Sequence, residues 1–495
     1  MLKDVVQIHR SVREALNPST LRTTEESQAF GKNLRQRLPI EDQGIWEAAE
    51  NRPDPVDLLR SQEAQRVQSL LPIRYQRMSA SPFAFYRGTA LIMAQDLSGL
   101  PNTGVTVQLC GDAHIANFGL FASPERRIVF DINDFDETLP GPWEWDIKRL
   151  AASIEICGRT VGFSKGERKD AVKACARRYR QAIREFAEMG NLEVWYAHLD
   201  VDHLMQMYSE NLTDLDTKAA KKLLKKAQGK DSARAIRKLT EVVDGNLRFI
   251  SNPPLIVPMR DLIYEDLAQK AGADAAATFT RAFDNQTIEF RMSVILAQYL
   301  KSLAPDKRHL IGSYIPVDMA RKVVGVGSVG TRAWVIVLKG ADEHDPLVLQ
   351  VKEAQESVLE RFVGKSTYAQ SGERVVEGQR AMQTASDVLL GWCRVPDVEG
   401  SLKDYYVRQL WDGKGSFNLD VVTPKQLYHM AEDCGWTLAH AHARTGNRFA
   451  LASYLGETGE FEKAIAHFAR AYAKQNEADY QRFLTALDEG QLPTA

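Results

Sequence analysis

The sequence lacks the features that mark secreted, membrane and nucleic-acid-binding proteins. Its five cysteines are widely spaced and form no Cys-x-x-Cys pair, a pattern typical of reduced core thiols rather than of disulfides or a zinc site. The formal net charge is −2, so the overall charge does not favour nucleic acid as a partner. No apolar run is long enough to span a bilayer, and residues 1–10 lack the apolar segment of a signal peptide. We therefore expect a cytoplasmic protein with no membrane partner.

The length of the chain and the pattern of residue types along it predict an α+β protein with a helical large lobe and a β-rich small lobe. Its 495 residues exceed the roughly 250–300 at which a single core stops growing. Residues 1–80 are polar and predict an N-terminal helical extension. Residues 81–312 begin with short strands and continue mainly as helices from 146 to 310, whereas 313–411 are rich in β-branched and aromatic residues. Residues 412–495 return to helical periodicity and are expected to complete the large lobe.

Local signals place several of these elements. Ser164 with Glu167 three residues later fits a capping box, and Thr423 before a proline is typical of a helix start. Two apolar runs at 332–338 and 347–352 are separated by a polar turn. This pattern predicts a β-hairpin with a long loop.

A glycine-rich segment precedes that hairpin: Gly325-Val326-Gly327-Ser328-Val329-Gly330. Its G-x-G-x-x-G pattern is shared by dinucleotide folds and kinase loops. A dinucleotide fold needs a helix after the third glycine, but here a β-branched and aromatic run predicts a strand. We therefore expect a strand–loop–strand hairpin whose backbone approaches nucleotide phosphates, because glycine puts no Cβ in the way. The residues expected at the phosphates are Gly325, Gly327, Ser328 and Gly330.

Lys352 ends the second strand of the hairpin and completes the predicted phosphate site. In kinase-like enzymes a strand lysine binds the nucleotide phosphates and is itself held by a helix glutamate. Glu377, in the helix-like segment 373–387, is the first candidate for that glutamate, and Glu356 is the second. A lysine at a strand end can also point to solvent, but the preceding glycine loop favours the functional interpretation.

Two acidic segments upstream carry the residues expected to act on an acceptor and a metal. In the segment 111–117, Asp112 can accept or orient a hydroxyl proton, and Asn117 can reach a metal ion. Asp131 follows a β-like run and is the second predicted metal ligand, because Mg²⁺ is commonly bound by one or two carboxylates with water and phosphate. Negative charge beside this ligand is expected from Asp134, Asp136 and Glu137.

Simpler interpretations compete with this one. A Ca²⁺ loop is excluded because it requires glycine where the chain has Asp136. An acidic turn that binds nothing is the remaining alternative. His114 is interpreted as a structural residue of its loop, and His440 and His442 as structural residues that point to different sides of one helix.

The order of these segments is the reverse of the usual one, because the glycine loop lies more than two hundred residues after the acidic segments. In ordinary kinase-like enzymes the glycine loop comes first. The sequence therefore predicts a phosphotransferase with permuted halves.

The motifs resemble those of a known superfamily. Leu109-Cys110-Gly111-Asp112-x-His114-x-x-Asn117, Phe130-Asp131 and Trp145-Asp146-Ile147 are similar to the aminoglycoside phosphotransferase branch of the protein-kinase-like superfamily. This resemblance implies a two-lobed kinase-like fold with ATP and Mg²⁺ as cofactors. It implies Asp112 as catalytic base, Asn117 and Asp131 as metal ligands, Lys352 as phosphate-binding lysine, and Asp146 as the acid that braces the catalytic loop. It also implies Tyr405 to Leu410 as the strand that meets the adenine, with Arg408 among the nucleotide-binding residues.

A second resemblance covers most of the chain. The segments 81–88, 141–150, 323–330 and 405–410 are similar to those of the bacterial family called domain of unknown function 2252. That family implies no substrate.

The leading hypothesis is an ATP- and Mg²⁺-dependent phosphotransferase that acts on a hydroxyl of a small acceptor. The alternatives are nucleotidyl transfer on the same fold and a non-catalytic nucleotide-binding regulator. A basic segment at Lys218 to Lys238 is interpreted as a solvated helix face rather than as a site for a polyanion.

Overall fold

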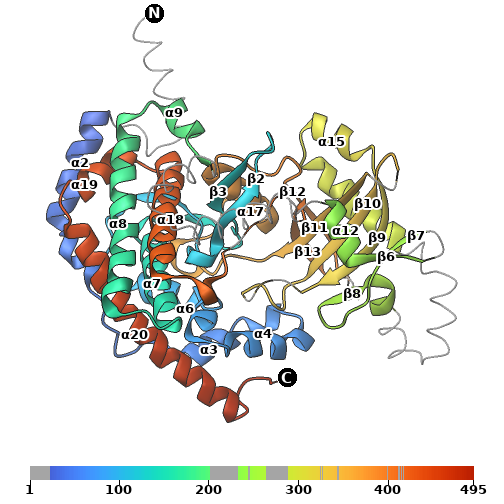
Figure 1. Ribbon diagram of the computed structural model, residues 1–495, viewed down its shortest axis with the longest axis horizontal. Helices are drawn as coiled ribbons and strands as arrows, with labels where there is room; N and C mark the ends of the chain where they lie inside the picture. Colours follow the sequence, from blue (N-terminus) through green and yellow to red (C-terminus); the bar gives the residue numbers. More distant parts are fainter. Residues whose placement is uncertain are drawn as a thin grey trace, which may run out of the picture.

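The computed structural model describes residues 23–200, 232–243, 246–263 and 288–494, apart from 324, 326, 343–344, 398–399, 411–412, 414 and 416. Figure 1 shows long helices gathered in one half of the molecule and a β-sheet in the other, with strands of the sheet drawn in yellow and orange. The protein is thus of mixed α+β class, as the sequence predicts. The predicted basic segment lies largely outside the described residues, which include it only from 232.

The larger sheet has six antiparallel strands in the order β12-β13-β11-β10-β9-β8. In the central hairpin Trp334 pairs with Val351 and Ala333 with Lys352, so the predicted hairpin is confirmed. β8 pairs with β9 at the edge of the sheet, although the sequence assigned residues 146–310 mainly to helices. The strands are β8 (Ile256–Pro258), β9 (Ile315–Lys322), β10 (Ala333–Lys339), β11 (Pro346–Ala354), β12 (Gly391–Pro396) and β13 (Leu402–Gln409).

Successive side chains of β10 point to opposite faces of this sheet, and both faces are apolar. Ile336 and Leu338 pack in one cluster with helical residues 288–301 and α15 (Pro305–Ile311). Val335 and Val337 pack on the opposite face against α12 (Ser232–Leu239). A strand buried on both faces reads as a continuous apolar run, which is what the sequence shows here.

The helical half is built around α7 (Glu144–Thr160), α8 (Lys165–Glu188), α18 (Pro424–Thr445) and α20 (Glu460–Asp488). The predicted capping box of Ser164 and Glu167 is present, and Thr423 caps α18. Trp143 is fully buried and stacks on Tyr179 at 5.8 Å between ring centroids. The remaining helices there are α2 (Thr24–Arg37), α9 (Asn191–Tyr196) and α19 (Arg448–Leu455).

Short strands carry the acidic segments between the two halves. β1 pairs with β4, β2 with β3, and β3 with β5, while a separate hairpin joins β6 and β7. The helix α17 (Ser371–Met382) lies against β12 and β13. The strands are β1 (Thr106–Leu109), β2 (Phe118–Ala122), β3 (Ile128–Ile132), β4 (Leu139–Pro142), β5 (Leu199–Asp200), β6 (Thr240–Val243) and β7 (Asn246–Phe249).

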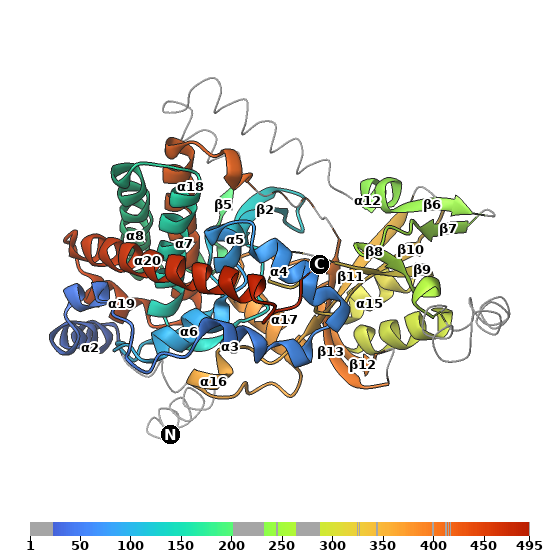
Figure 2. The same cartoon turned by 90° about the horizontal axis from the view of Figure 1, so that it is seen from below.

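In the described part of the predicted N-terminal extension, α2 packs on α19 in the helical half, whereas α3 and α4 lie along the junction between the halves, as Figures 1 and 2 show. Arg52 ties the extension to the helical half, because its guanidinium donates to Asp96 at 2.7 Å and to Asp479 of α20 at 2.8 Å. The helices are α3 (Pro55–Arg60), α4 (Leu71–Met78), α5 (Pro82–Tyr86) and α6 (Ala90–Ser98).

Two expectations about composition agree with the structure. All five cysteines are buried and free. Among the described residues, no helix has the length and apolar character needed to cross a membrane.

Replacing Arg52 by Met should strongly destabilise the protein, because it leaves Asp96 and Asp479 buried without a counterion. Breaking a buried ion pair of this kind costs about 3–5 kcal/mol. Urea unfolding should show a clear fall of the midpoint. The matched change Arg178→Met removes an exposed pair with Glu185 and should shift stability by less than about 1 kcal/mol. Equal shifts in the two variants would show that the Arg52 network is not an anchor.

Candidate functional site

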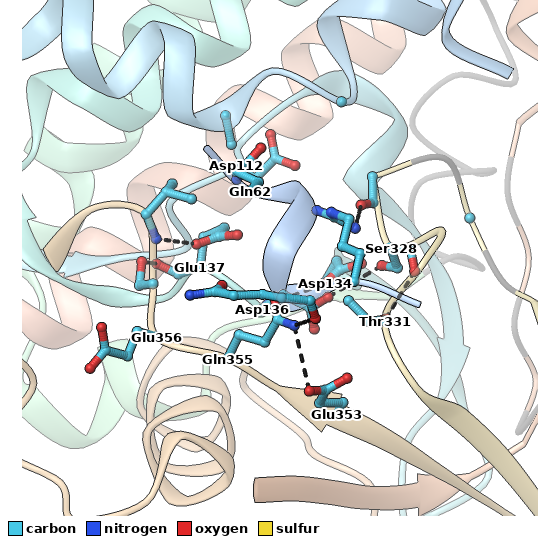
Figure 3. Close-up of a pocket in the computed structure, with 18 of the residues that line it drawn as sticks. Gln62, Asp112, Asp134, Asp136, Glu137, Ser328, Thr331, Glu353, Gln355 and Glu356 are labelled. Atoms are coloured by element: carbon cyan, nitrogen blue, oxygen red, sulfur yellow. Dashed lines mark hydrogen bonds between the residues drawn. The ribbon is translucent and has the colours of Figure 1, made fainter. Parts of the chain in front are cut away.

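A polar cavity of about 350 Å³ lies where the acidic segments, the glycine hairpin and the N-terminal segment meet (Figure 3). The structure brings many predicted site residues to it, since Asp112, Asn117, Gly325, Gly327 and Ser328 all line it. It is also lined by Asp134, Asp136, Glu137, Arg66, Arg87 and Glu353.

Lys352 does not line this cavity but is ion-paired with two acids that do, Asp134 and Asp136. The lysine is 2% exposed, and its Nζ forms a close ion pair with Asp136 and lies 3.7 Å from Asp134 Oδ2. Tyr406 Oη donates to the other oxygen of Asp136 at 2.9 Å. The lysine therefore does not point to solvent but joins β11 to the acidic loop.

The charges of this cluster support one another. Burial alone would lower the pKa of Lys352, but the carboxylates of Asp134 and Asp136 outweigh it and raise that pKa above its usual value. Burial raises the pKa of Asp136, as does repulsion from Asp134, and Lys352 opposes both effects. Because the lysine stays charged, it keeps the two carboxylates together at one wall of the cavity.

Asp112 offers a carboxylate oxygen to the same cavity. Arg149 Nε donates to Asp112 Oδ1 at 2.6 Å, and the guanidinium of this buried arginine also lies 4.4 Å from the centre of the Tyr86 ring. No described residue donates a hydrogen bond to Asp112 Oδ2. His114 lies beside it, but burial lowers the pKa of this histidine to about 4. His114 is therefore neutral near pH 7, in agreement with a structural role.

The loop that carries Asp112 is held by Asp146 of α7. The Asp146 carboxylate accepts from the backbone N–H of Cys110 at 2.7 Å and of Gly111 at 3.0 Å. His442 lies 3.4 Å from the same carboxylate and contacts Tyr179 at 2.8 Å. The bracing role that the resemblance implied for Asp146 matches these bonds, and His442 is structural, as expected. Asn117 closes the loop by donating from Nδ2 to the Asp112 carbonyl at 2.8 Å.

Three arginines of the N-terminal segment hold the glycine loop by its carbonyl groups. Arg74 donates to the Gly327 carbonyl at 2.9 Å, and Arg66 donates to the Val329 carbonyl at 2.7 Å. Arg77 donates to the carbonyl of Gly325 at 2.5 Å. With these carbonyls fixed from outside, the hairpin is held against the cavity. Gly330, predicted at the phosphates, instead packs on Arg66 and does not line the cavity.

The predicted glutamate partner of Lys352 is not where the sequence placed it. Glu377 pairs with Arg380 at 2.7 Å, and Glu356 pairs with Lys365 at 2.7 Å. The face of α17 toward the acidic loop carries Gly378, where a Cβ would lie 2.5 Å from the Thr138 side chain. The close packing leaves no room for a side chain at position 378, and the long side chain that α17 does extend to the acidic loop is that of Arg374. The partners of Lys352 are the aspartates instead.

Arg374 is the residue of α17 that binds the acidic loop. It is 1% exposed and donates to the backbone carbonyls of Thr138 at 2.6 Å, Asp136 at 2.9 Å and Gln355 at 2.8 Å. The helix thus positions the Asp136 segment through its backbone.

Asp131, predicted as a metal ligand, does not line the cavity. It lies inside β3, where it pairs with Gly119, and its carboxylate accepts from the Thr384 N–H at 3.4 Å. Burial raises the pKa of Asp131 to about 7. The strand ends at Ile132, so the acids that reach the cavity are those just beyond it, Asp134 and Asp136.

Arg408 also differs from the prediction. Its strand β13 pairs with β11 over residues 404–409 and with β12 over residues 402–407. The Arg408 guanidinium donates to the Asn133 carbonyl at 3.3 Å and to Gln350 at 3.1 Å. It supports the acidic loop from behind and does not line the cavity.

Several site residues carried only weak signals in the sequence. Asp134 and Asp136 were visible as extra negative charge, and their place just after a strand end was the signal that could have selected them. Arg66, Arg74 and Arg374 act on backbone carbonyls, which no motif spacing reports.

Comparison with known families agrees with the second resemblance. A family model described as an uncharacterized protein conserved in bacteria, domain of unknown function 2252, matches residues 66–486. Since this is most of the chain, the protein belongs to that family. No curated protein and no solved structure matches the chain. The family region begins at Arg66 and includes the acidic loops, the glycine loop and Lys352.

The Asp131→Asn variant should be more resistant to unfolding than the native protein at high pH. The folded-state pKa of about 7 is above the ordinary 3.8, so between these values the folded state keeps a proton that the unfolded state has lost. Stability therefore falls as pH rises, by up to about 1.4 kcal/mol per pH unit. Urea unfolding at pH 5 and pH 8 should show the variant gaining on the native protein at pH 8. An unchanged difference between the two conditions would contradict the assigned burial effect.

Proposed function

We propose that this protein is a phosphotransferase that moves the γ-phosphoryl group of ATP to a hydroxyl group. The observation that carries the proposal is that one cavity gathers a glycine loop, a pair of aspartates and an Asp–x₄–Asn loop from segments far apart in the chain, while the buried Lys352, which does not itself line the cavity, is ion-paired to those aspartates. Phosphoryl transfer needs positioning and neutralisation of charge more than covalent chemistry, and these groups supply both.

The proposed roles follow from the contacts. The glycine loop covers the phosphates, and Lys352, displaced from its present ion pair, binds their oxygens. Asp112 Oδ2, which has no donor among the described residues, accepts the proton of the acceptor hydroxyl. Arg149 holds Oδ1 and so keeps the carboxylate oriented.

The donors present fit a magnesium ion bound together with phosphates. No group of three or more His, Cys, Asp or Glu side chains in the described part of the chain is arranged to hold a metal alone, but Mg²⁺ usually takes only one or two carboxylates and completes its shell with water and phosphate. Asp134 is 31% exposed at the cavity, and Asn117 uses its amide nitrogen for the loop, which leaves its oxygen for a cation. When bound, Mg²⁺ would neutralise charge on the phosphates. Asp134 and Asn117 thus replace the predicted pair of Asp131 and Asn117.

The arrangement also agrees with a permuted kinase-like fold. A glycine hairpin (β9 and β10), the lysine strand β11, helix α17 and the pair β12 and β13 follow one another in the chain, and the Asp112 and Asp134 loops that share their cavity come before them. Ordinary kinases contain the same elements, but the glycine hairpin comes first in their chains.

ATP labelled separately at the α- and γ-phosphates tests the proposal directly. With Mg²⁺, we expect the γ-label to move to an acceptor hydroxyl in a mixture of small hydroxylated metabolites or, without one, to water at a slow rate. Transfer of the α-label would indicate nucleotidyl transfer. Binding of ATP with no transfer of either label would indicate a nucleotide-binding regulator.

The Asp112→Asn variant should lose about 10²–10⁴-fold in the rate of γ-label transfer, the range for removal of a general base. Its affinity for ATP should stay near that of the native protein, because Asp112 acts on the acceptor. Transfer rates and ATP titrations on the same preparation measure both. A variant with near-native turnover would remove Asp112 from the mechanism.

The Asp134→Asn variant should weaken ATP binding in the presence of Mg²⁺ and have a smaller effect in its absence. Asp131→Asn is the matched control, since the same change three residues away lies outside the cavity and should leave the Mg²⁺ dependence intact. Calorimetric titration of ATP with and without Mg²⁺ gives the comparison. If Asp131→Asn abolished the Mg²⁺ dependence and Asp134→Asn did not, the assignment of the ligand would be reversed.

A further inference from the structure

A second cavity, of about 620 Å³, lies next to the first, and Arg87 lines both. Apolar side chains form much of its wall, among them Phe83, Phe118, Phe417 and Met430. Its composition therefore differs from that of the first cavity, where acids dominate. Its charged lining residues are Arg87 and Asp420, so an organic anion bound here must place its anionic group on Arg87 rather than beside the Asp420 carboxylate.

The loop that carries Asp112 forms the partition between the two cavities. Asn117 lines the first cavity, whereas its neighbours Ala116 and Phe118 line the second. A molecule seated in the second cavity therefore lies against the same loop that presents Asp112, on the side away from the glycine hairpin and Lys352. This is where an acceptor must approach if the nucleotide occupies the first cavity.

Arg87 has an unused guanidinium at the junction. It follows α5, and within the described part of the chain it makes no side-chain hydrogen bond and no ion pair; its Nε is fully shielded and has no partner. Burial lowers the pKa of Arg87, and the charges of Asp112, Asp420 and Asp134 oppose that effect without contacting it. Nε is the Arg87 nitrogen that is fully shielded, and a shielded donor without a partner is costly unless a ligand supplies an acceptor.

Other arginines near the cavity are engaged. Arg66 and Arg74 are bound to glycine-loop carbonyls, and Arg149 is bound to Asp112. Arg87 differs from these three because nothing in the described structure uses its donors. Its planar fork matches a carboxylate or a phosphate group.

We propose that the second cavity binds the acceptor of the transfer, and that this acceptor is a small molecule with an apolar body and an anionic group held by Arg87. That the bound molecule is the acceptor of the transfer rests on the proposed function, but binding of an anion at Arg87 can be tested without measuring activity. Because Arg87 lines both cavities, the anion is held at their junction, and in this proposal the acceptor hydroxyl reaches Asp112 from that junction.

The step balances with ATP as the donor. The acceptor hydroxyl oxygen forms a bond to the γ-phosphorus, and the bond from that phosphorus to the β,γ-bridging oxygen breaks, so ADP leaves with the electron pair. The hydroxyl proton passes to Asp112 Oδ2 and then to solvent. Arg87 stays bound to the anionic group and takes no part in bond exchange.

Binding of a matched set of probes tests the anion site. 4-Hydroxyphenylacetate, its amide and tyramine share one ring and one hydroxyl but are anionic, neutral and cationic, respectively. Phenyl phosphate tests a phosphate in place of the carboxylate. A linear ω-hydroxy acid and its amide test an alkyl body in place of the ring. Ligand-observed NMR titrations on the full chain should show that the native protein prefers the anion in at least one body series. The carboxylate and phosphate arms show which anion it prefers.

Three variants locate the site. Arg87→Gln should weaken the anionic probe about tenfold or more, the expected loss of a charge-assisted hydrogen bond, and should leave the neutral amide unchanged. Phe417→Ser, at a residue 37% exposed that contacts Phe130 edge-on, should weaken both probes, and its folding cost is read from the unfolding curve. Arg361→Gln is the matched control, because Arg361 lines only the first cavity and should leave the probes unaffected. Thermal unfolding of each variant confirms that it is folded.

The outcomes separate this proposal from the proposed function. No preference for the anion in either body series, or an unchanged affinity in Arg87→Gln, overturns the anion site. An Arg87→Gln variant that loses affinity for ATP but not for the anionic probes assigns Arg87 to the nucleotide and also overturns it. If anionic probes bind through Arg87 but ATP does not bind, the anion site stands and the phosphotransferase proposal fails.

Discussion

The ion pair of Lys352 with Asp134 and Asp136 is the contact on which the arrangement of the site depends. It joins a strand of the six-stranded sheet to the loop after β3, across 216 residues of sequence. An ammonium group that is 2% exposed must have carboxylates beside it, since burying an unpaired charge is prohibitive. The sheet and the helical half are therefore held in one relative position at this point. Tyr406, Arg374 and Arg408 then fix the loop that carries the acids through its side chains and its carbonyls.

Backbone groups are the second means by which the site is fixed. Asp146 receives two backbone N–H groups below Asp112, and the arginines of the N-terminal segment bind the carbonyls of the glycine loop. Both sides of the cavity are thus shaped by side chains that bind the backbone of its loops, from behind the cavity for Asp146 and Arg74 and from its wall for Arg66. A site held in this way presents preorganised groups to a ligand, which is the main requirement for transfer chemistry that depends on positioning.

Local patterns in the sequence were enough to predict the elements, but not the side chains that face the cavity. The strand–loop–strand hairpin and the capped helix at Ser164 follow from periodicity and caps, which act within a few residues. Asp131 could not be separated from Asp134 by pattern alone, because the choice depends on where β3 ends. Glu377 was the wrong partner because Lys352 meets an aspartate 216 residues away, whereas Glu377 pairs with Arg380 of its own helix. The paired edges of β13 and the strand β8 likewise depend on neighbours distant in the chain.

The long reach of these contacts has a consequence for the protein as it is being synthesised. Chains emerge from the ribosome N-terminus first, so Arg74 precedes its Gly327 carbonyl by 253 residues and Asp136 precedes Lys352 by 216. A nascent chain that ends before Gly325 holds the acids without their counterion and the arginines without their acceptors. The acidic loop thus cannot settle in its final position until the sheet has been made. In this protein early arginines hold the late glycine loop and late residues hold the early acidic loop, so the cavity is complete only when both halves have been translated.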